Sequence, residues 1–221
     1  MKNSVNSNFY PILINLERFP CLIIGGGKVA YRKVISLQKY NADITILSPK
    51  ICKPLLGLAE KNRIRIIRRS YSKEFVKGYK VIFSATDNPE VNKMVRSDCT
   101  KEGILLNVVD NPALCDFILP ANIKRGDLTI SVSSQGKAPF YTKEMKQKIE
   151  EFISPVYSDI IELAAKFRKQ LLTSGNVKSA KTKAKMFRKF TSVNWEKILT
   201  ENGKKSSVYY IEKILGKSNL S

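Results

Sequence analysis

The sequence of 221 residues contains no histidine, only one tryptophan, and 19 acidic residues against 39 basic ones. The absence of histidine removes the commonest general base and metal ligand, and it excludes every Ser-His or Cys-His catalytic arrangement. Any chemistry must therefore rest on a carboxylate, a lysine, a tyrosine or a bound cofactor.

Closely spaced cysteines and long apolar runs are also lacking. The four cysteines form no Cys-x-x-Cys pair, so we expect buried or unreactive thiols, with no disulfide and no metal site. No segment approaches the roughly 20 apolar residues that a membrane span needs, and residues 1–7 lack the apolar run of a signal peptide. These features predict a cytoplasmic protein that does not cross a membrane.

What the chain has in excess is positive charge, with a formal net charge of +20. Such a charge favours an anionic partner, which composition alone leaves open between nucleic acid, a membrane surface and a polycarboxylate ligand. A solvated helical face is the alternative explanation. The charge is concentrated between Leu163 and Trp195, where no acid occurs and the basic residues are Lys166, Arg168, Lys169, Lys178, Lys181, Lys183, Lys185, Arg188 and Lys189.

Short apolar segments alternate with helical ones in the first half of the chain, a pattern typical of a parallel sheet covered on both faces. Asn88 and Pro89 predict the start of one of these helices and Gly103 its end. We therefore predict an α/β fold with a Rossmann-type domain over residues 1–113. The five expected strands are Cys21–Ile24, Asp43–Leu47, Ile64–Ile67, Val81–Ser84 and Ile104–Val109.

The pattern changes after this domain. Phe117–Pro120 and Leu128–Val132 flank a polar turn and predict an antiparallel hairpin. Apolar residues at helical spacing follow Pro139 and Pro155, and two short helices are expected around Trp195–Leu199 and Val208–Leu215. We thus expect a small α+β segment over residues 114–152 and a helical domain over residues 153–221.

Three consecutive glycines follow the first expected strand. Gly25, Gly27 and Ala30 fit the G-x-G-x-x-G/A pattern of dinucleotide-binding proteins. In that pattern the first glycine makes the tight turn, the second lets the backbone approach a pyrophosphate, and the small third residue lets the helix pack on the strand. Helix N-termini favour phosphate, so this turn predicts a dinucleotide site.

The preferred dinucleotide is left open by the residues after the second strand. NAD-binding domains commonly place an acid there to bind the ribose, whereas this chain has Ser48, Pro49 and Lys50. Ser48 is suited to the ribose hydroxyls. Lys50 either favours the 2′-phosphate of NADP or is an ordinary loop lysine.

Two further segments follow strands at the edge where parallel sheets bind ligands. Ser84, Ala85 and Thr86 are small enough to let a cofactor pass close to the backbone. Asn107 opens the second segment, in which Asp110 directly follows a buried strand and is expected to face the nicotinamide. The alternative is that Asp110 only forms a turn before Asn-Pro.

Together these motifs resemble the dehydrogenase module of siroheme synthases, the precorrin-2 dehydrogenases, over roughly residues 8–152. The segments that carry the resemblance are Tyr10–Ile12, Cys21–Lys33, Ser84–Asp87, Asn107–Asp110, Phe117–Ala121 and Ser133–Pro139.

The resemblance implies a homodimer that oxidises precorrin-2 to sirohydrochlorin with NAD, and residues 114–152 would form its dimerisation segment. It implies that Asp110 is the general base, that NAD contacts the backbone of Lys28 and Val29 and the turn at residues 48–50, and that Ser134 and Lys137 contact the substrate. A polycarboxylate tetrapyrrole also offers a reason for the positive charge. Gln135 departs from the pattern, because many relatives have glycine there.

Two alternatives remain. Some relatives also insert iron into sirohydrochlorin, and incubation with sirohydrochlorin and ferrous iron without NAD would detect that ferrochelatase activity. A second alternative is an NAD-sensing or nucleic-acid-binding regulatory protein. The missing acid after the second strand argues against the first of these roles, and the few aromatics among the basic residues argue against the second, since bases stack on aromatic side chains.

Overall fold

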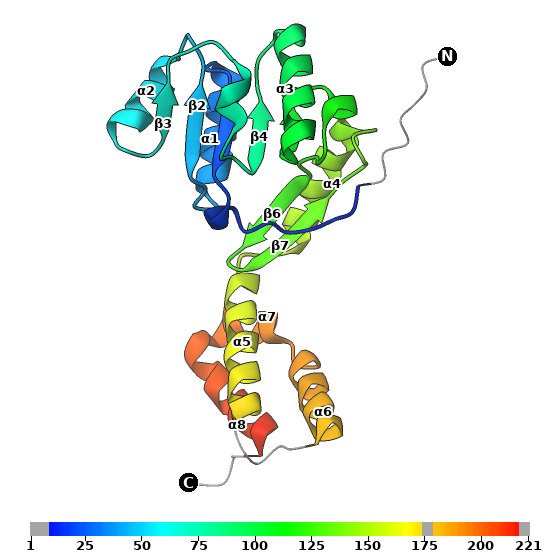
Figure 1. The fold of residues 1–221 in the computed structure, drawn as a ribbon. Coiled ribbons are helices and arrows are strands. Elements are labelled where there is room, and N and C mark those ends of the chain that lie inside the picture. Colours follow the sequence, from blue (N-terminus) through cyan, green and yellow to red (C-terminus); the bar gives the residue numbers. More distant parts are fainter. Residues whose placement is uncertain (1–8, 174–178, 217–221) are drawn as a thin grey trace. The chain divides into compact units, whose positions relative to one another are not determined.

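The structure, a computed structural model, describes residues 9–173 and 179–216. The chain forms two compact units, divided between Leu119 and Pro120 (Figure 1). Within these described residues, the first unit contains a five-stranded sheet, and the second contains a hairpin and five α-helices. The finer division at residues 113 and 152 stays a prediction.

The sheet of the first unit is parallel throughout, as the alternating pattern predicted. Its strand order is β3-β2-β1-β4-β5, so that β1 lies at the centre with β2 and β4 on either side. Reversal of strand order on the two sides of β1 gives the crevice in which such sheets bind dinucleotides. The strands are β1 Cys21–Ile24, β2 Ile44–Leu47, β3 Arg65–Ile67, β4 Val81–Ser84 and β5 Leu105–Val108.

Helices on both faces cover this sheet. The chain forms α1 (Lys28–Gln38), α2 (Lys53–Glu60) and α3 (Pro89–Glu102). The start of α3 is the predicted one, since Asn88 Oδ1 accepts the backbone N–H groups of Glu90 and Val91 at 3.0 and 3.2 Å. Gly103 ends the helix in the left-handed region, at a φ of 65° that favours glycine.

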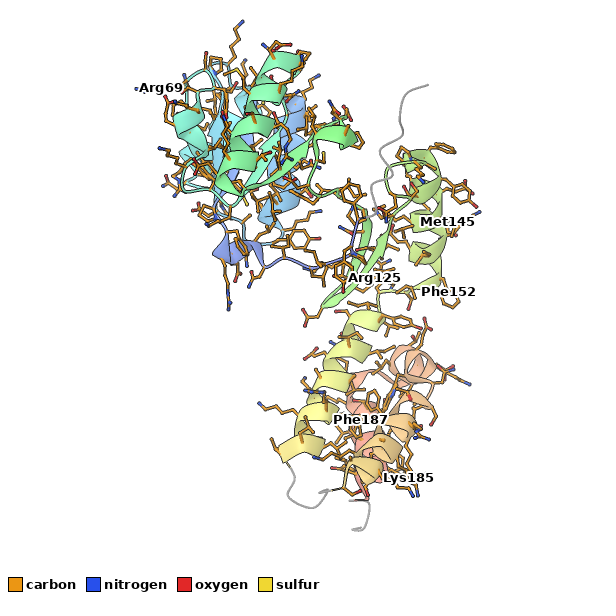
Figure 2. All side chains as sticks on the ribbon, turned by 45° about the vertical axis from the view of Figure 1, so that its right-hand side comes forward. Arg69, Arg125, Met145, Phe152, Lys185 and Phe187 are labelled. Atoms are coloured by element: carbon orange, nitrogen blue, oxygen red, sulfur yellow. The ribbon has the colours of Figure 1, made fainter. Side chains whose placement is uncertain are left out.

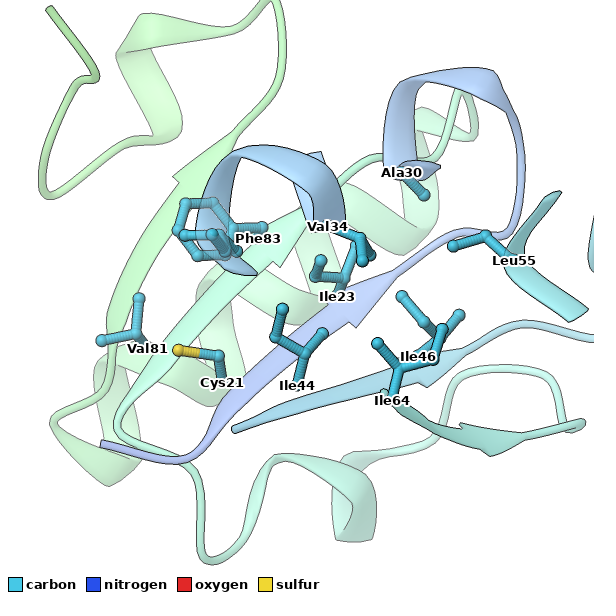
Figure 3. Packing of buried hydrophobic residues seen from close by; sticks show 11 residues of the cluster. Cys21, Ile23, Ala30, Val34, Ile44, Ile46, Leu55, Ile64, Val81 and Phe83 are labelled. Carbon is cyan, nitrogen blue, oxygen red and sulfur yellow. The ribbon is translucent and has the colours of Figure 1, made fainter. Parts of the chain in front are cut away.

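Alternation along β1 creates two separate cores. Cys21 and Ile23 face α1 and α2 (Figure 3), whereas Leu22 and Ile24 face α3. All four side chains are buried because successive residues of a strand point to opposite faces. A continuous apolar strand is therefore the sequence signature of a sheet covered on both sides.

Each core contains one cysteine, and these thiols predict a pH effect on stability. Burial raises the pKa of Cys21 to about 11 and that of Cys99 to about 12, from 9.0. Because the folded state favours the protonated thiol, its stabilising contribution is complete below pH 9 and is lost as the pH rises through 11 to 12. We expect the Tm to fall above pH 9, and Cys21→Ala to make that fall shallower in thermal unfolding followed by circular dichroism. An equally steep fall in Cys21→Ala would contradict the role of this thiol.

The hairpin of the second unit begins later than the sequence predicted. It pairs β6 (Ala121–Arg125) with β7 (Leu128–Val132) in antiparallel register. Phe117–Pro120 is not a strand, so this part of the prediction was wrong. The Phe117 ring packs edge-on against Phe83 of the first unit, with ring centroids 5.5 Å apart, and its carbonyl accepts the Asn107 amide at 3.0 Å. These contacts hold Phe117 against the sheet, and Pro120 has no N–H to donate to a ladder.

Five α-helices complete the second unit. Arg125 of the hairpin donates hydrogen bonds to the carbonyls of Ile153 and Glu150, at 3.1 and 3.2 Å, at the end of the first of these helices, α4 (Pro139–Phe152). Within the described residues, none of the helices combines the length and apolarity that crossing a bilayer requires. The helices are α4 Pro139–Phe152, α5 Tyr157–Thr173, α6 Ala180–Thr191, α7 Trp195–Asn202 and α8 Ser207–Leu215.

Aromatic residues of α5 to α8 form the core of the helical part. Phe167 stacks on Phe190 with ring centroids 4.7 Å apart, and Trp195 donates its indole N–H to the Phe190 carbonyl at 2.7 Å. Helix α6 carries most of the basic run (Figure 2), with Phe187 in contact with Phe167 and Lys185 exposed. Lys178 of that run lies outside the described residues. The basic charge therefore occupies the solvent side of an amphipathic helix.

Candidate functional site

The three consecutive glycines differ in whether the fold leaves room for a side chain at their position. Gly25 has a φ of 121°, and a Cβ atom added there would overlap the carbonyl of Ala85. A Cβ at Gly26 would overlap the carbonyl of Lys50. At Gly27, by contrast, a Cβ would meet nothing within 4 Å. The fold itself therefore requires the first two glycines, whereas the third leaves open space above the start of α1.

The first turn of α1 presents backbone donors beside that space. Gly27 is the N-cap and supplies no side-chain cap, and its carbonyl accepts the N–H of Tyr31 at 3.0 Å. The N–H groups before Tyr31, including those of Lys28 and Val29, have no acceptor within the helix. Donors of this kind, together with the helix dipole, suit an anionic phosphate.

The turn after β2 lies against the glycine turn. Ser48 donates its N–H to the Ile67 carbonyl at 3.1 Å and its hydroxyl to the Lys50 carbonyl at 2.9 Å. The Cys52 N–H in turn donates to the Gly26 carbonyl at 2.8 Å. These bonds fix the backbone of Ser48, Pro49 and Lys50 beside the glycines. The hydroxyl of Ser48 keeps its lone pairs for a ribose donor.

A buried polar pair shapes the turn after β4. Ser84 donates its hydroxyl to Asn92 Oδ1 at 2.6 Å, and the Asn92 amide donates to the Thr86 carbonyl at 3.3 Å. The Ala85 N–H donates to the Ile24 carbonyl at 2.7 Å, which joins this turn to the end of β1. Sequence reasoning missed Asn92. Its signal was a polar residue three positions before Val95, on the buried side of α3.

Asp110 follows β5 at the same edge of the sheet as the glycine turn. Its side chain is exposed, and its backbone lies in the left-handed region with a φ of 61°. The neighbouring Val109 N–H donates to the Ser84 carbonyl at 2.9 Å, which fixes the Asp110 loop to the turn after β4. Asn107, predicted to contact the cofactor, has its amide bonded to the Phe117 carbonyl instead of projecting freely.

The far side of the Asp110 loop is also anchored. Cys115 Sγ accepts the Val108 N–H at 3.1 Å, and its thiol lies within donating distance, 3.3 Å, of the carbonyls of both Val108 and Asn111. Asp116 accepts the Leu106 N–H at 3.0 Å and pairs with Arg96 at 2.8 Å. The loop that presents Asp110 is thus held at both ends while the carboxylate faces solvent.

Lys33 on α1 is a further candidate, which the sequence analysis named only as the end of the Cys21–Lys33 segment. Its ammonium nitrogen lies 5.2 Å from the centroid of the Phe83 ring. Burial lowers the pKa of Lys33, and Arg32 lowers it further, while the ionised forms of Cys115 and Asp110 raise it. The signal in the sequence was its position: with Ala30, Val34 and Leu37 it completes the i, i+3, i+4, i+7 pattern of a buried helix face.

Ser134 and Lys137 belong to the second unit, in the connection between β7 and α4. Ser134 accepts the Ala138 N–H on its hydroxyl at 2.9 Å and the Lys137 N–H on its carbonyl at 3.0 Å. Gln135 between them has a φ of 56°. Glycine would reach this left-handed conformation without strain, so the position favours glycine physically.

Comparison with known proteins agrees with this geometry. Residues 12–121 match a family model described as putative NAD(P)-binding. The fold and the glycine turn therefore define an NAD(P)-binding protein of the Rossmann type. A solved structure titled SirC, precorrin-2 dehydrogenase, superimposes with a TM-score of 0.75 over 93% of this chain and 100% of that one, at 24% sequence identity, and supports the fold.

Relatives with higher sequence identity agree with the resemblance that the motifs predicted. The chain is 38% identical to the siroheme synthase of Ruthia magnifica subsp. Calyptogena magnifica over 161 residues, 73% of this chain and 34% of that protein. It is 36% identical to the siroheme synthase of Saccharophagus degradans over 163 residues, 74% of this chain and 36% of that protein. The chain is thus similar to one part of the siroheme synthases, as its motifs predicted, and it spans about a third of the length of these relatives.

Proposed function

We propose that this protein is a precorrin-2 dehydrogenase, which oxidises precorrin-2 to sirohydrochlorin with NAD in siroheme or related tetrapyrrole biosynthesis. The observation that carries the proposal is the position of Asp110. Its exposed carboxylate follows β5 at the sheet edge that also holds the glycine turn. In a chain of this family, that placement brings a proton acceptor to the side where the nicotinamide end of a dinucleotide binds.

The residues of the first unit fit such a cofactor. The open space at Gly27 and the first-turn N–H groups suit a pyrophosphate, and Ser48 is suited to the adenine ribose. Bound NAD would supply the hydride acceptor. NAD is our proposal over NADP because the family uses it, and Lys50 remains the residue to examine for any use of NADP.

The chain's own contribution to the reaction is proton transfer and positioning. Asp110 accepts the proton that the substrate loses as its hydride leaves, a role that typically contributes about 10²–10⁴-fold to the rate. The bonds from Val109 to Ser84 and from Cys115 to Val108 hold the loop that carries this carboxylate. Ser134 and Lys137 of the second unit are proposed substrate contacts, and the positive net charge attracts the polycarboxylate substrate.

We also propose a homodimer formed through residues 114–152. Helix α4 supports this assembly, because it buries none of its residues and exposes the large apolar side chains of Phe140, Tyr141 and Phe152. Apolar patches of this kind mark interaction surfaces in soluble proteins.

The function is tested by incubating the purified protein with precorrin-2 and NAD. We expect NADH absorbance to appear together with the spectrum of sirohydrochlorin. The reaction should be much slower when NADP replaces NAD. A protein that forms no NADH from precorrin-2, although it binds NAD, would refute the proposed activity.

A further inference from the structure

Lys33 is a cation placed on the buried side of a helix. Ala30, one turn before it, and Val34, the next residue, are fully buried in the core beneath α1. Phe83, over which the Lys33 ammonium lies, is 1% exposed. The lysine stem therefore lies along apolar surface, and its charged end reaches the Phe83 ring at the third residue of β4.

The ammonium has little compensation for its lost hydration. An aromatic face attracts a cation, but it satisfies none of the three N–H donors as an oxygen acceptor does. Across residues 9–173 and 179–216, no hydrogen bond or ion pair joins the Lys33 side chain to another residue. An unpaired cation that is partly removed from water gains strongly from an anionic acceptor.

The Lys33 ammonium lies on the side of the sheet edge that carries Asp110. Asp110 and Cys115 follow β5, and the charged form of each raises the pKa of Lys33. β4 and β5 are paired neighbours, with Phe83 opposite Asn107. Lys33 thus approaches the edge that carries Asp110 from the face covered by α1, away from the first-turn donors proposed to bind the pyrophosphate.

We propose that Lys33 is a substrate-binding residue, whose ammonium donates hydrogen bonds to a carboxylate of the tetrapyrrole and positions it next to Asp110. This inference rests on the proposed function. A polycarboxylate substrate supplies the acceptor that Lys33 lacks within the described protein. The same contact would orient the reacting carbon toward the Asp110 carboxylate.

The test compares Lys33→Met and Lys33→Arg with the wild-type protein. Sirohydrochlorin affinity is measured by absorbance titration without NAD, and KM and kcat are measured with precorrin-2. Loss of one charged hydrogen bond corresponds to a roughly 10- to 100-fold weaker affinity. We expect Lys33→Met to raise the Kd for sirohydrochlorin and the KM for precorrin-2 by that factor. Lys33→Arg should restore most of the affinity, and the Kd for NAD should stay unchanged.

Two controls separate substrate binding from general effects. Lys39→Met removes the same charge from the exposed end of α1 and should leave substrate affinity within twofold. Thermal unfolding should show Lys33→Met to be at least as stable as the wild type, since methionine fills the apolar site without a charge to desolvate.

The outcomes distinguish this inference from the proposed function. If the wild type oxidises precorrin-2 but Lys33→Met binds sirohydrochlorin as tightly, only the role of Lys33 is refuted. An equal loss of NAD affinity, or an equal loss in Lys39→Met, would also refute it. A wild-type protein that neither oxidises precorrin-2 nor binds sirohydrochlorin would refute both.

Discussion

Asp110→Asn is expected to lower kcat for precorrin-2 oxidation by roughly 10²–10⁴-fold, the usual contribution of a positioned general base. Asparagine keeps the size of the side chain but accepts a proton far more weakly. It is also the best replacement for the backbone, because Asp110 has a φ of 61° and asparagine adopts left-handed conformations readily. Alanine would add backbone strain to the chemical change, so its effect would be harder to interpret.

The expected loss should be confined to chemistry. Because Asp110 is exposed and none of its side-chain atoms supports the loop, the Tm and the Kd for NAD of Asp110→Asn should equal those of the wild type. Asp127→Asn is the matched control, since it makes the same substitution at the exposed tip of the β6–β7 hairpin. Full precorrin-2 oxidation by Asp110→Asn, or an equal loss in Asp127→Asn, would show that another group accepts the proton.

Gly25→Ala and Gly27→Ala are expected to fail in different ways. At Gly25 the new methyl group meets the Ala85 carbonyl, and the φ of 121° is unfavourable for any L-residue. Together these effects should lower the free energy of unfolding by about 3 kcal/mol. At Gly27 the methyl group meets no protein atom within 4 Å, and the φ of −91° is ordinary. Gly27→Ala should therefore fold normally.

The second variant should instead lose cofactor. A methyl group at Gly27 projects into the space proposed for the pyrophosphate, so the Kd for NAD should rise roughly tenfold or more. Urea unfolding without cofactor and calorimetric titration with NAD measure the two effects separately. Unchanged NAD affinity in Gly27→Ala would place the pyrophosphate elsewhere, and an unchanged unfolding free energy in Gly25→Ala would contradict the close approach to Ala85.

Features that depend on neighbouring residues were predicted correctly from the sequence, whereas one that depends on a distant contact was not. The sequence placed the turn, the five strands and the N-cap at Asn88 because each depends on neighbouring residues. It assigned Phe117–Pro120 to a strand because apolar β-formers precede a turn there. That assignment failed because Phe117 packs on Phe83, a residue more than thirty positions earlier, which no local pattern records.

The candidate site divides in the same way. Gly25, Gly27 and Asp110 were predicted as site residues from the sequence, since the motif and the end of a buried strand mark them directly. Asn92 and Lys33 were missed as site residues. Each is a polar residue at helical spacing with apolar ones, but its importance depends on which strand the helix covers.

By itself, the sequence determined the parallel α/β class, the glycine turn and the resemblance to siroheme synthases, because apolar periodicity, glycine spacing and motif order are features of the chain itself. Only the tertiary structure decided that Gly26 must also be glycine, that Ser84 is bonded to Asn92, and that the Lys33 ammonium lies over the Phe83 ring. The physical reason is that each of these depends on a close approach between segments brought together by sheet pairing and helix packing.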